Sequence, residues 1–334
     1  MGEKILLSHG SGGKMSHDLV ARAFLPAFGN PILDRLDDAA VFDSQGRLAF
    51  TTDSYVVNPI FFPGGDIGRL AVCGTVNDLA MMGAKPLYLS LALIIEEGLP
   101  EDDLKKVVES IRKADMEAEV QIVTGDTKVV HRGSADKLFI NTAGIGAVPE
   151  GVNISGRNAK VGDKVILSGT IGDHGIAVLS RREGLKFATT IESDSAPLGK
   201  LVARMLEASS NIHCLRDPTR GGLASTLNEL AAQSGVGIRI EEEKTPVKEE
   251  VRSACDMLGL DPLYIANEGK LIAMVSPEDA ERVLEAMRRN IYGRNAAIIG
   301  EVTLTHPGRV VLKTGFGTSR IVDMPVGDLL PRIC

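Results

Sequence analysis

The stretch of residues 66–95, DIGRLAVCGTVNDLAMMGAKPLYLSLALII, decides the class of fold. Its first part, Asp66 to Met82, predicts a helix that ends before Gly83 and Pro86, since both residues disfavour helix. Its second part, Leu87 to Ile95, is an almost continuous apolar run, as expected of a strand buried on both faces of a sheet. A buried strand directly after a helix indicates an α/β arrangement.

Strand and helix signals alternate through the rest of the first half. Further strands are predicted for Leu48 to Thr52, Val120 to Thr124 and Leu138 to Val148. After Pro100 the sequence predicts an amphipathic helix, because apolar residues recur at intervals of three and four, at Leu104, Val107, Val108 and Ile111.

A polar connector, Pro149 to Gly162, separates this half from a second one. The second half is predicted to contain strands near 164–167, 236–240, 270–275, 297–302 and 309–313, and helices near 198–208, 221–233 and 277–290. A chain of 334 residues is also too long for one comfortable hydrophobic core. We therefore predict two domains of the α/β (α+β-like) class, residues 1–150 and 160–310.

The chain ends with MPVGDLLPRIC, residues 324–334. Its prolines and glycine disfavour a helix, so we predict an extended, movable tail over residues 314–334. The tail carries Cys334, one of four cysteines, none of which forms a C-x-x-C pair that would indicate zinc or a thioredoxin-like site. A thiol on a movable tail is suited to carry a chemical group. An incidental terminal cysteine is the alternative.

Composition excludes several classes of protein. Hydrophobic residues make up 44% and charged residues 24%, the balance of a soluble globular protein. The net charge of −7 disfavours a nucleic-acid surface. No apolar run approaches the roughly 18 residues of a membrane span, and the N-terminal apolar stretch is too short for a signal peptide. We expect a cytoplasmic protein with neither nucleic-acid nor membrane partners.

The segment from His9 to Lys14, HGSGGK, resembles a phosphate-binding P-loop only superficially. Met15 stands where that motif needs serine or threonine, and the spacing of the glycines is wrong. The segment is either a flexible turn or a glycine-rich flap that closes over phosphates with its backbone amides and Lys14.

Acidic residues recur beside small residues at five places. These places are Asp37-Asp38, Thr52-Asp53 at the end of a predicted strand, Asn77-Asp78 within a helix, Gly125-Asp126-Thr127 at the end of another strand, and Asp217-Pro-Thr-Arg-Gly-Gly before a helix. Each aspartate alone could be a turn or helix-capping residue. Together they indicate a site for Mg²⁺ and a nucleotide, because Mg²⁺ prefers carboxylate and phosphate oxygens.

In this order, the five segments resemble the family of ATP-using enzymes that includes aminoimidazole ribonucleotide synthetase, selenophosphate synthetase and thiamine monophosphate kinase. The segment 9–14, Asn267-Glu268-Gly269-Lys270 and the ending Pro331-Arg-Ile-Cys334 resemble its hydrogenase-maturation members in particular. The resemblance implies two αβ domains, a homodimer built through the N-terminal domains, and a groove for ATP and Mg²⁺.

The resemblance also implies roles for single residues. The implied metal ligands are Asp38, Asp53, Asp78 and Asp217. The implied nucleotide contacts are Asp37, Asn77, Asp126 and Thr127, with Gly12, Gly13 and Lys14 in the flap.

The reaction implied by the resemblance is ATP-dependent dehydration of a carbamoyl group on Cys334, from thiocarboxamide to thiocyanate. The cyanide would then serve as a ligand of the iron in a NiFe-hydrogenase. A carbamoyltransferase would supply the carbamoyl group, and an iron-carrying complex would accept the cyanide. Glu268 is the candidate base and Lys128 the candidate to tune Glu268 or stabilise an oxyanion. A surface ion pair is the alternative for these two residues.

Two other functions are compatible with the residues. One is a phosphoryl-transfer enzyme that acts on a small molecule, and the other is a non-catalytic thiol carrier or scaffold whose acidic groups only bind a cation. His131 and His174 lie near predicted loops and receive no role.

Overall fold

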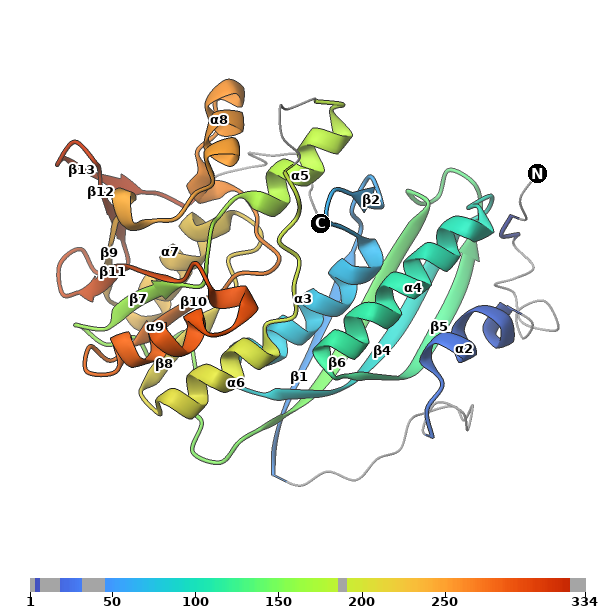
Figure 1. Cartoon of the computed structure of the whole chain (residues 1–334), viewed down its shortest axis with the longest axis horizontal. Helices are drawn as coiled ribbons and strands as arrows, with labels where there is room; N and C mark the ends of the chain where they lie inside the picture. Colours follow the sequence, from blue (N-terminus) through green and yellow to red (C-terminus); the bar gives the residue numbers. More distant parts are fainter. Residues whose placement is uncertain (1–3, 7–18, 32–45, 186–190, 325–334) are drawn as a thin grey trace.

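Two β-sheets with packed helices organise the chain (Figure 1). The computed structural model describes residues 4–6, 19–31, 46–185 and 191–324. Within them, one sheet has the strand order β1-β6-β4-β5 and the other the order β13-β12-β9-β11-β7-β10-β8. A short hairpin, β2 (Phe61–Phe62) and β3 (Gly65–Asp66), follows β1.

The four-stranded sheet belongs to the first half of the chain. It consists of β1 (Arg47–Tyr55), β4 (Lys85–Glu96), β5 (Gln121–Val130) and β6 (Leu138–Val148). β4 and β5 run parallel, whereas β6 runs antiparallel to β1 and to β4. Two long helices, α3 (Ile67–Met81) and α4 (Glu101–Ala118), pack against each other and against this sheet. The short η2 (Val20–Phe24) and α2 (Leu25–Phe28) adjoin α4.

Helix α3 is buried around almost its whole circumference, because it lies between the four-stranded sheet and the second half of the chain. Asp66 caps its start by accepting hydrogen bonds from the N–H groups of Gly68 and Arg69, at 2.8 and 3.0 Å. Its small residues let other elements approach closely, so α3 can carry polar side chains to the junction of the two halves.

The seven-stranded sheet belongs to the second half. Its strands are β7 (Lys164–Leu167), β8 (Ile212–Arg216), β9 (Gly237–Glu241), β10 (Ile272–Val275), β11 (Ala297–Thr303), β12 (Val310–Lys313) and β13 (Ser319–Val322). Helix α7 (Gly222–Ser234) packs in one hydrophobic cluster on this sheet, and α6 (Gly199–Ala208) and α9 (Ala280–Arg288) pack in another.

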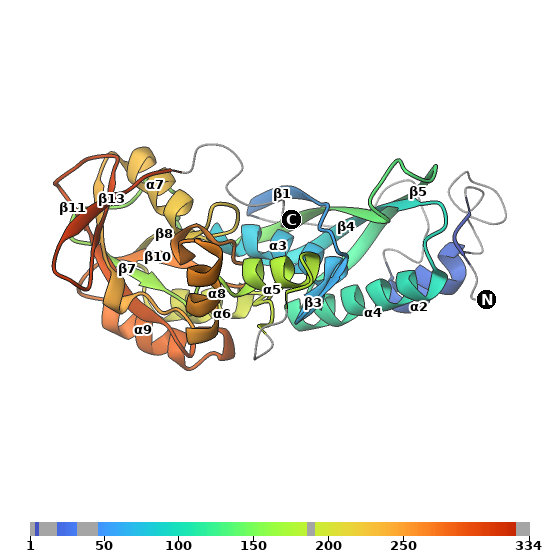
Figure 2. The same cartoon turned by 90° about the horizontal axis from the view of Figure 1, so that it is seen from above.

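Helices α5 (Asp173–Arg182) and α8 (Glu249–Leu258) complete the second half, with short helical turns η4 (Glu242–Lys244), η5 (Pro262–Tyr264) and η6 (Ile291–Gly293). Figure 2 shows the two halves along the long axis of the molecule, with α3 and α5 where they meet. None of the helices in the described ranges is long and apolar enough to cross a bilayer.

The predicted elements are confirmed, with shifts of a few residues at their ends, but the predicted set was incomplete. The sequence did not predict α5, β8, α8 or β13. Two placements were wrong. Asp126 does not end a strand but lies in the middle of β5, paired with Ala92 of β4. The strand extends to Val130 because β4 supplies hydrogen-bond partners up to that residue.

The second error concerns the start of the predicted tail. Residues 319–322 form β13, which pairs with β12, and Val322 is buried in the hydrophobic core. Pairing with an existing edge strand supplies the hydrogen bonds that this polar segment lacks by itself. The segment 314–324 is therefore part of the sheet region, and residues 325–334 lie outside the described part of the chain.

Candidate active site

Three aspartates from both halves come together where α3 meets the second half. Asp53 lies in β1, Asp78 near the end of α3, and Asp217 directly after β8. The Thr51 hydroxyl donates to Asp78 Oδ2 at 2.7 Å, so β1 orients the carboxylate from α3. The Tyr55 hydroxyl donates to Asp53 Oδ2 at 3.0 Å. Because alternate residues of a strand share one face, Thr51, Asp53 and Tyr55 all face α3.

The negative charges of these aspartates repel one another. Burial, together with the neighbouring carboxylates of Asp78 and Asp53, raises the pKa of Asp217 to about 7, against the opposing effect of Arg216. Burial also raises the pKa of Asp78, and Asp53 adds to this effect, while the hydrogen bond from Thr51 opposes it. Such a cluster is stabilised by a bound cation.

The donor set fits a hard divalent cation, since every donor is a carboxylate oxygen. In the described ranges, no three His, Cys, Asp or Glu residues lie close enough together to hold a metal ion by themselves. Mg²⁺ needs only one or two protein carboxylates, because phosphate oxygens and water supply its other ligands. Asp38, the fourth predicted ligand, lies outside the described residues.

Glu268 reaches the same junction from the second half. It lies between η5 and β10 and is buried, with 5% of its surface exposed. Its negative charge contributes, with burial and Asp53, to raising the pKa of Tyr55, whose hydroxyl holds Asp53. The predicted base therefore lies close to the predicted metal ligands, although they come from different domains.

Asn77 is near this junction but is occupied by contacts between the two halves. Its Nδ2 donates to the carbonyl of Ala196 at 3.0 Å and to that of Glu268 at 3.4 Å, and its Oδ1 accepts from the N–H of Leu198 at 2.8 Å. These contacts give Asn77 a role in joining the halves. Its predicted contact with the nucleotide stays a prediction.

The structure does not bring Asp126, Thr127 and Lys128 to this site within one chain. They lie in β5, at the opposite edge of the sheet from β1, and three strand spacings of about 4.8 Å separate the two edges by about 14 Å. Through the pairs 126–92, 92–141 and 141–54, Asp126 shares a face with Ser54 and not with Asp53. Lys128 Nζ lies 3.3 Å from Asp126 Oδ1, and both side chains are more than half exposed.

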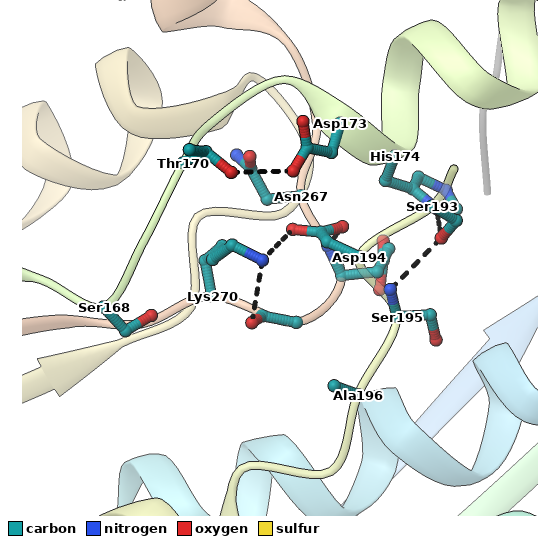
Figure 3. A network of polar contacts seen from close by, with 12 residues as sticks. Ser168, Thr170, Asp173, His174, Ser193, Asp194, Ser195, Ala196, Asn267 and Lys270 are labelled. Atoms are coloured by element: carbon teal, nitrogen blue, oxygen red, sulfur yellow. Dashed lines mark hydrogen bonds and ion pairs between the residues drawn. The ribbon is translucent and has the colours of Figure 1, made fainter. Parts of the chain in front are cut away.

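A second polar cluster was not anticipated from the sequence (Figure 3). Lys270 Nζ lies 3.0 Å from Asp194 Oδ2, and both side chains are almost fully buried. His174 Nδ1 lies 2.8 Å from the Ser193 hydroxyl, and burial lowers the pKa of His174 to about 4, so this histidine is neutral. Only the position of Lys270, two residues after Glu268, could have drawn attention to the cluster.

Six predicted site residues lie outside the described part of the chain, so their predicted roles are not tested by this structure. They are Gly12, Gly13, Lys14, Asp37, Asp38 and Cys334.

The fold and the site define a protein related to AIR synthase. The model of the AIR synthase related N-terminal domain matches residues 36–148, and that of the C-terminal domain matches residues 160–313. The chain is 57% identical to the carbamoyl dehydratase HypE of Bradyrhizobium diazoefficiens, over 98% of this chain and 95% of that protein.

Solved structures agree with this relation. A hydrogenase maturation protein HypE in complex with ATP superposes with a TM-score of 0.95 at 52% identity, covering 98% of this chain and 99% of the other. The HypE chain of a HypE–HypF complex superposes with a TM-score of 0.82 at 55% identity, covering 92% and 99%. The chain belongs to the HypE family of carbamoyl dehydratases, which confirms the resemblance and the fold class expected from the motifs.

Proposed function

We propose that this chain uses ATP and Mg²⁺ to dehydrate a carbamoyl group carried on its own Cys334, and so supplies cyanide for the iron of a NiFe-hydrogenase. The main support for this proposal is that four acidic residues from two domains lie close together in a member of the HypE family, namely Asp53, Asp78, Asp217 and Glu268. The HypE relative whose structure contains ATP supports ATP as the co-substrate.

The chemistry explains why ATP is needed. The thiocarboxamide oxygen is a poor leaving group until it attacks the γ-phosphorus of ATP and displaces ADP. The carbon–oxygen bond then breaks, phosphate leaves, and nitrogen loses both protons as the triple bond forms. One proton ends on the phosphate and the other is released. The products are therefore thiocyanate, ADP, phosphate and one proton.

The residues of the chain divide this work. Glu268 is the proposed base that removes a nitrogen-bound proton, because it is a buried carboxylate beside the acidic cluster. Asp38, Asp53, Asp78 and Asp217 would hold Mg²⁺, which supplies neutralisation of the phosphate charge when bound. Asp37, Asn77, Asp126 and Thr127 are the proposed nucleotide contacts, with Gly12, Gly13 and Lys14 as the flap.

A homodimer built through the N-terminal domains is part of this proposal. The face of the four-stranded sheet that carries Asp126 also exposes apolar side chains, namely Leu48 (47%), Phe50 (71%) and Ile94 (41%). Burying them against a second copy is favourable. It would also let Asp126 and Lys128 of one copy approach the other copy, which a single chain does not allow.

Two partners are proposed, one that donates the carbamoyl group and one that accepts the cyanide. HypF would be the carbamoyl donor, and the solved HypE–HypF complex of a relative supports this partner. A HypC–HypD complex that carries iron would accept the cyanide. The proposed location is the cytoplasm.

Intact-mass measurement of the carbamoylated protein tests the function. Protein carbamoylated by HypF is incubated with and without Mg-ATP, and the peptide that contains Cys334 is analysed. We expect loss of one water from this peptide only when Mg-ATP is present. If ATP binds and no water is lost, the proposed dehydration is wrong.

Replacing Cys334 by alanine is the control. Cys334→Ala should abolish the mass change and leave ATP binding intact. A small-molecule phosphoryl-transfer enzyme would keep its full turnover in this variant. A scaffold would hydrolyse no ATP even when the carbamoylated tail is present.

A further inference from the structure

The backbone of Glu268 is held without a helix or a strand. Residues 265–270 form no regular element, so the buried peptide groups of Glu268 need partners from elsewhere. Asp194 Oδ1 accepts the hydrogen bond of the Glu268 N–H at 3.0 Å, and Asn77 Nδ2 donates to the Glu268 carbonyl at 3.4 Å. Two side chains from distant parts of the sequence therefore set the position of this peptide.

An ion pair with Lys270 holds the Asp194 side chain in place. Lys270 Nζ lies 3.0 Å from its other oxygen, Oδ2, with 12% of the Lys270 side chain and 3% of the Asp194 side chain exposed. Burial alone would raise the pKa of Asp194, but Lys270, His174 and the hydrogen bond from the Glu268 N–H together lower it below its ordinary value, so the carboxylate stays charged. Lys270 also reaches the Gly269 carbonyl at 3.4 Å, and Figure 3 shows it pointing toward Asp194.

The backbones of the two segments also touch. A side chain at Gly269 would overlap the Asp194 carbonyl oxygen and lie 2.9 Å from the Ala196 nitrogen. Glycine is therefore required next to Glu268, because only the absence of a Cβ allows this close approach.

We call residues 191–198 the crossing loop, because the loop belongs to the second half by sequence but is anchored on the first. The N–H of Ser193 donates to the Pro63 carbonyl at 2.8 Å. Arg69 Nε donates to the Ser195 carbonyl at 2.9 Å. Further along, Asn77 bonds the Ala196 carbonyl and the Leu198 N–H. The crossing loop thus takes its position from the domain that carries Asp53 and Asp78.

We propose that Asp194, in the crossing loop, is a positioning residue for the dehydration. Paired with Lys270, it holds the peptide of Glu268 at a fixed place relative to Asp53 and Asp78. This inference rests on the proposed function, since it gives Asp194 a part in placing the proposed base. A base misplaced by about 1 Å can lose on the order of 100-fold in rate. The ion pair would therefore serve geometry more than stability.

Two double variants separate position from stability. D194L/K270M removes both charges and also the acceptor of the Glu268 N–H. D194N/K270M removes both charges but keeps an oxygen acceptor at the same place. Each is carbamoylated by HypF, given Mg-ATP, and followed by intact mass in a single turnover, together with ATP affinity and the melting temperature.

We expect D194L/K270M to lose water about 10- to 100-fold more slowly than wild type, with unchanged ATP affinity. D194N/K270M should regain most of the rate, because the asparagine oxygen can accept the same hydrogen bond. Equal rates in the two variants, or loss of ATP binding in D194L/K270M alone, would overturn the positioning role.

Asp163 offers a matched control in the same half. Its Oδ2 accepts from the Lys160 N–H at 2.8 Å and lies 2.8 Å from His213 Nδ1, so it is also a buried carboxylate with a backbone donor and a basic partner. Asp163→Leu should lower the melting temperature without slowing water loss at temperatures where the protein is folded. A rate loss equal to that of D194L/K270M would show that general destabilisation suffices, and would overturn the inference.

The same experiment distinguishes a failure of the proposed function from a failure of the positioning role. If wild-type protein loses no water, the dehydration is wrong, whatever the variants do. If wild type loses water and Glu268→Gln does not, a failure of the Asp194 variants to slow the reaction overturns only the positioning role.

Discussion

Tyr55 links the proposed metal ligands to the packing of the core at the scale of single residues. Its ring is buried, with 3% exposed, and its hydroxyl donates to Asp53 Oδ2. A side chain at Gly74 in α3 would overlap this hydroxyl, so glycine leaves room for the tyrosine. The orientation of Asp53 thus depends on a contact between β1 and α3.

Tyr55→Phe should weaken the use of Mg²⁺ while leaving the fold intact. The ring keeps its packing, and only the hydrogen bond to Asp53 is lost, which costs about 1 kcal/mol of stability. Loss of such an outer partner of a metal ligand reduces metal affinity or activity by about 10- to 100-fold. Titrating ATP turnover with Mg²⁺ measures the change.

Tyr264→Phe is the control for this variant. The Tyr264 hydroxyl donates to the Asp323 carbonyl at 3.0 Å in the second half and not to a proposed metal ligand. Its Mg²⁺ titration should match that of wild type. A Tyr55→Phe enzyme with an unchanged Mg²⁺ requirement would show that Asp53 needs no help from Tyr55.

Asp115, in the last turn of α4, makes stability depend on pH. Burial raises its pKa to about 7, against an unfolded value near 3.8. The folded protein therefore keeps a proton that the unfolded chain releases, so this group's contribution to stability is present at low pH and is lost as pH rises toward about 7. Asp115→Asn should flatten this dependence. The difference in free energy of unfolding between the variant and wild type should be about 2 kcal/mol more favourable to the variant at pH 8 than at pH 5.

Chemical unfolding at pH 5 and pH 8 measures this effect. Asp102→Asn in the same helix is the control, because 76% of the Asp102 side chain is exposed. The same pH dependence in Asp115→Asn and wild type would exclude Asp115 as its source.

At the scale of elements, the crossing of α3 and α4 sets where the site lies. A Cβ at Gly68 of α3 would lie 2.7 Å from the Val107 carbonyl oxygen and 2.8 Å from Ile111 Cγ1 of α4. Both neighbours are buried in the core and have little room to move. Because α3 also carries Asn77 and Asp78, a shift of this helix would displace the site.

Gly68→Ala should therefore destabilise the protein by about 1–3 kcal/mol and weaken ATP binding. Gly199→Ala, at the start of α6, is the matched control, since its Cβ would lie 3.7 Å from Pro86 Cδ, an ordinary contact. Thermal unfolding and ATP titration test both variants. A Gly68→Ala protein as stable as Gly199→Ala would mean that α3 and α4 can separate without cost.

Elements with a clear local pattern were predicted from the sequence, as the periodic apolar residues of α4 and the continuous apolar run of β4 show. β8 and β13 were missed because each is short and depends on a neighbour to complete its hydrogen bonds. α5 was missed because it follows a glycine in a left-handed conformation, Gly172, within a polar segment without a side-chain cap. Local propensity is weak in such segments, and tertiary packing decides their conformation.

At the scale of the whole molecule, a series of polar contacts joins the two halves. Arg69 donates to the Ser195 carbonyl at 2.9 Å and pairs with Glu117 at 2.8 Å, and Glu117 accepts from the Tyr292 hydroxyl. Residues of the N-terminal half thereby contact the second half at two separate places. We expect these contacts to couple the unfolding of the two halves.

Arg69→Met should uncouple them. Calorimetry should show a broader or two-step transition, because removing the guanidinium leaves Glu117 and the Ser195 carbonyl with one partner fewer. Arg112→Met is the control, since Arg112 pairs within α4 with Glu109 at 2.8 Å. A single sharp transition in Arg69→Met would show that other contacts suffice to join the halves.

The sequence by itself determined the fold class, the family and the types of side chain at the site. These depend on local patterns, namely the helix and strand of residues 66–95, the acidic motifs and their order along the chain. Only the tertiary structure decided which motifs meet. It brought Asp53, Asp78, Asp217 and Glu268 together, and placed Asp126 and Lys128 on the opposite face and edge of the sheet. It also revealed Asp194 and Lys270, because a residue that acts by holding another peptide has no motif of its own. Its partner is 74 residues away, and only folding brings the two into contact.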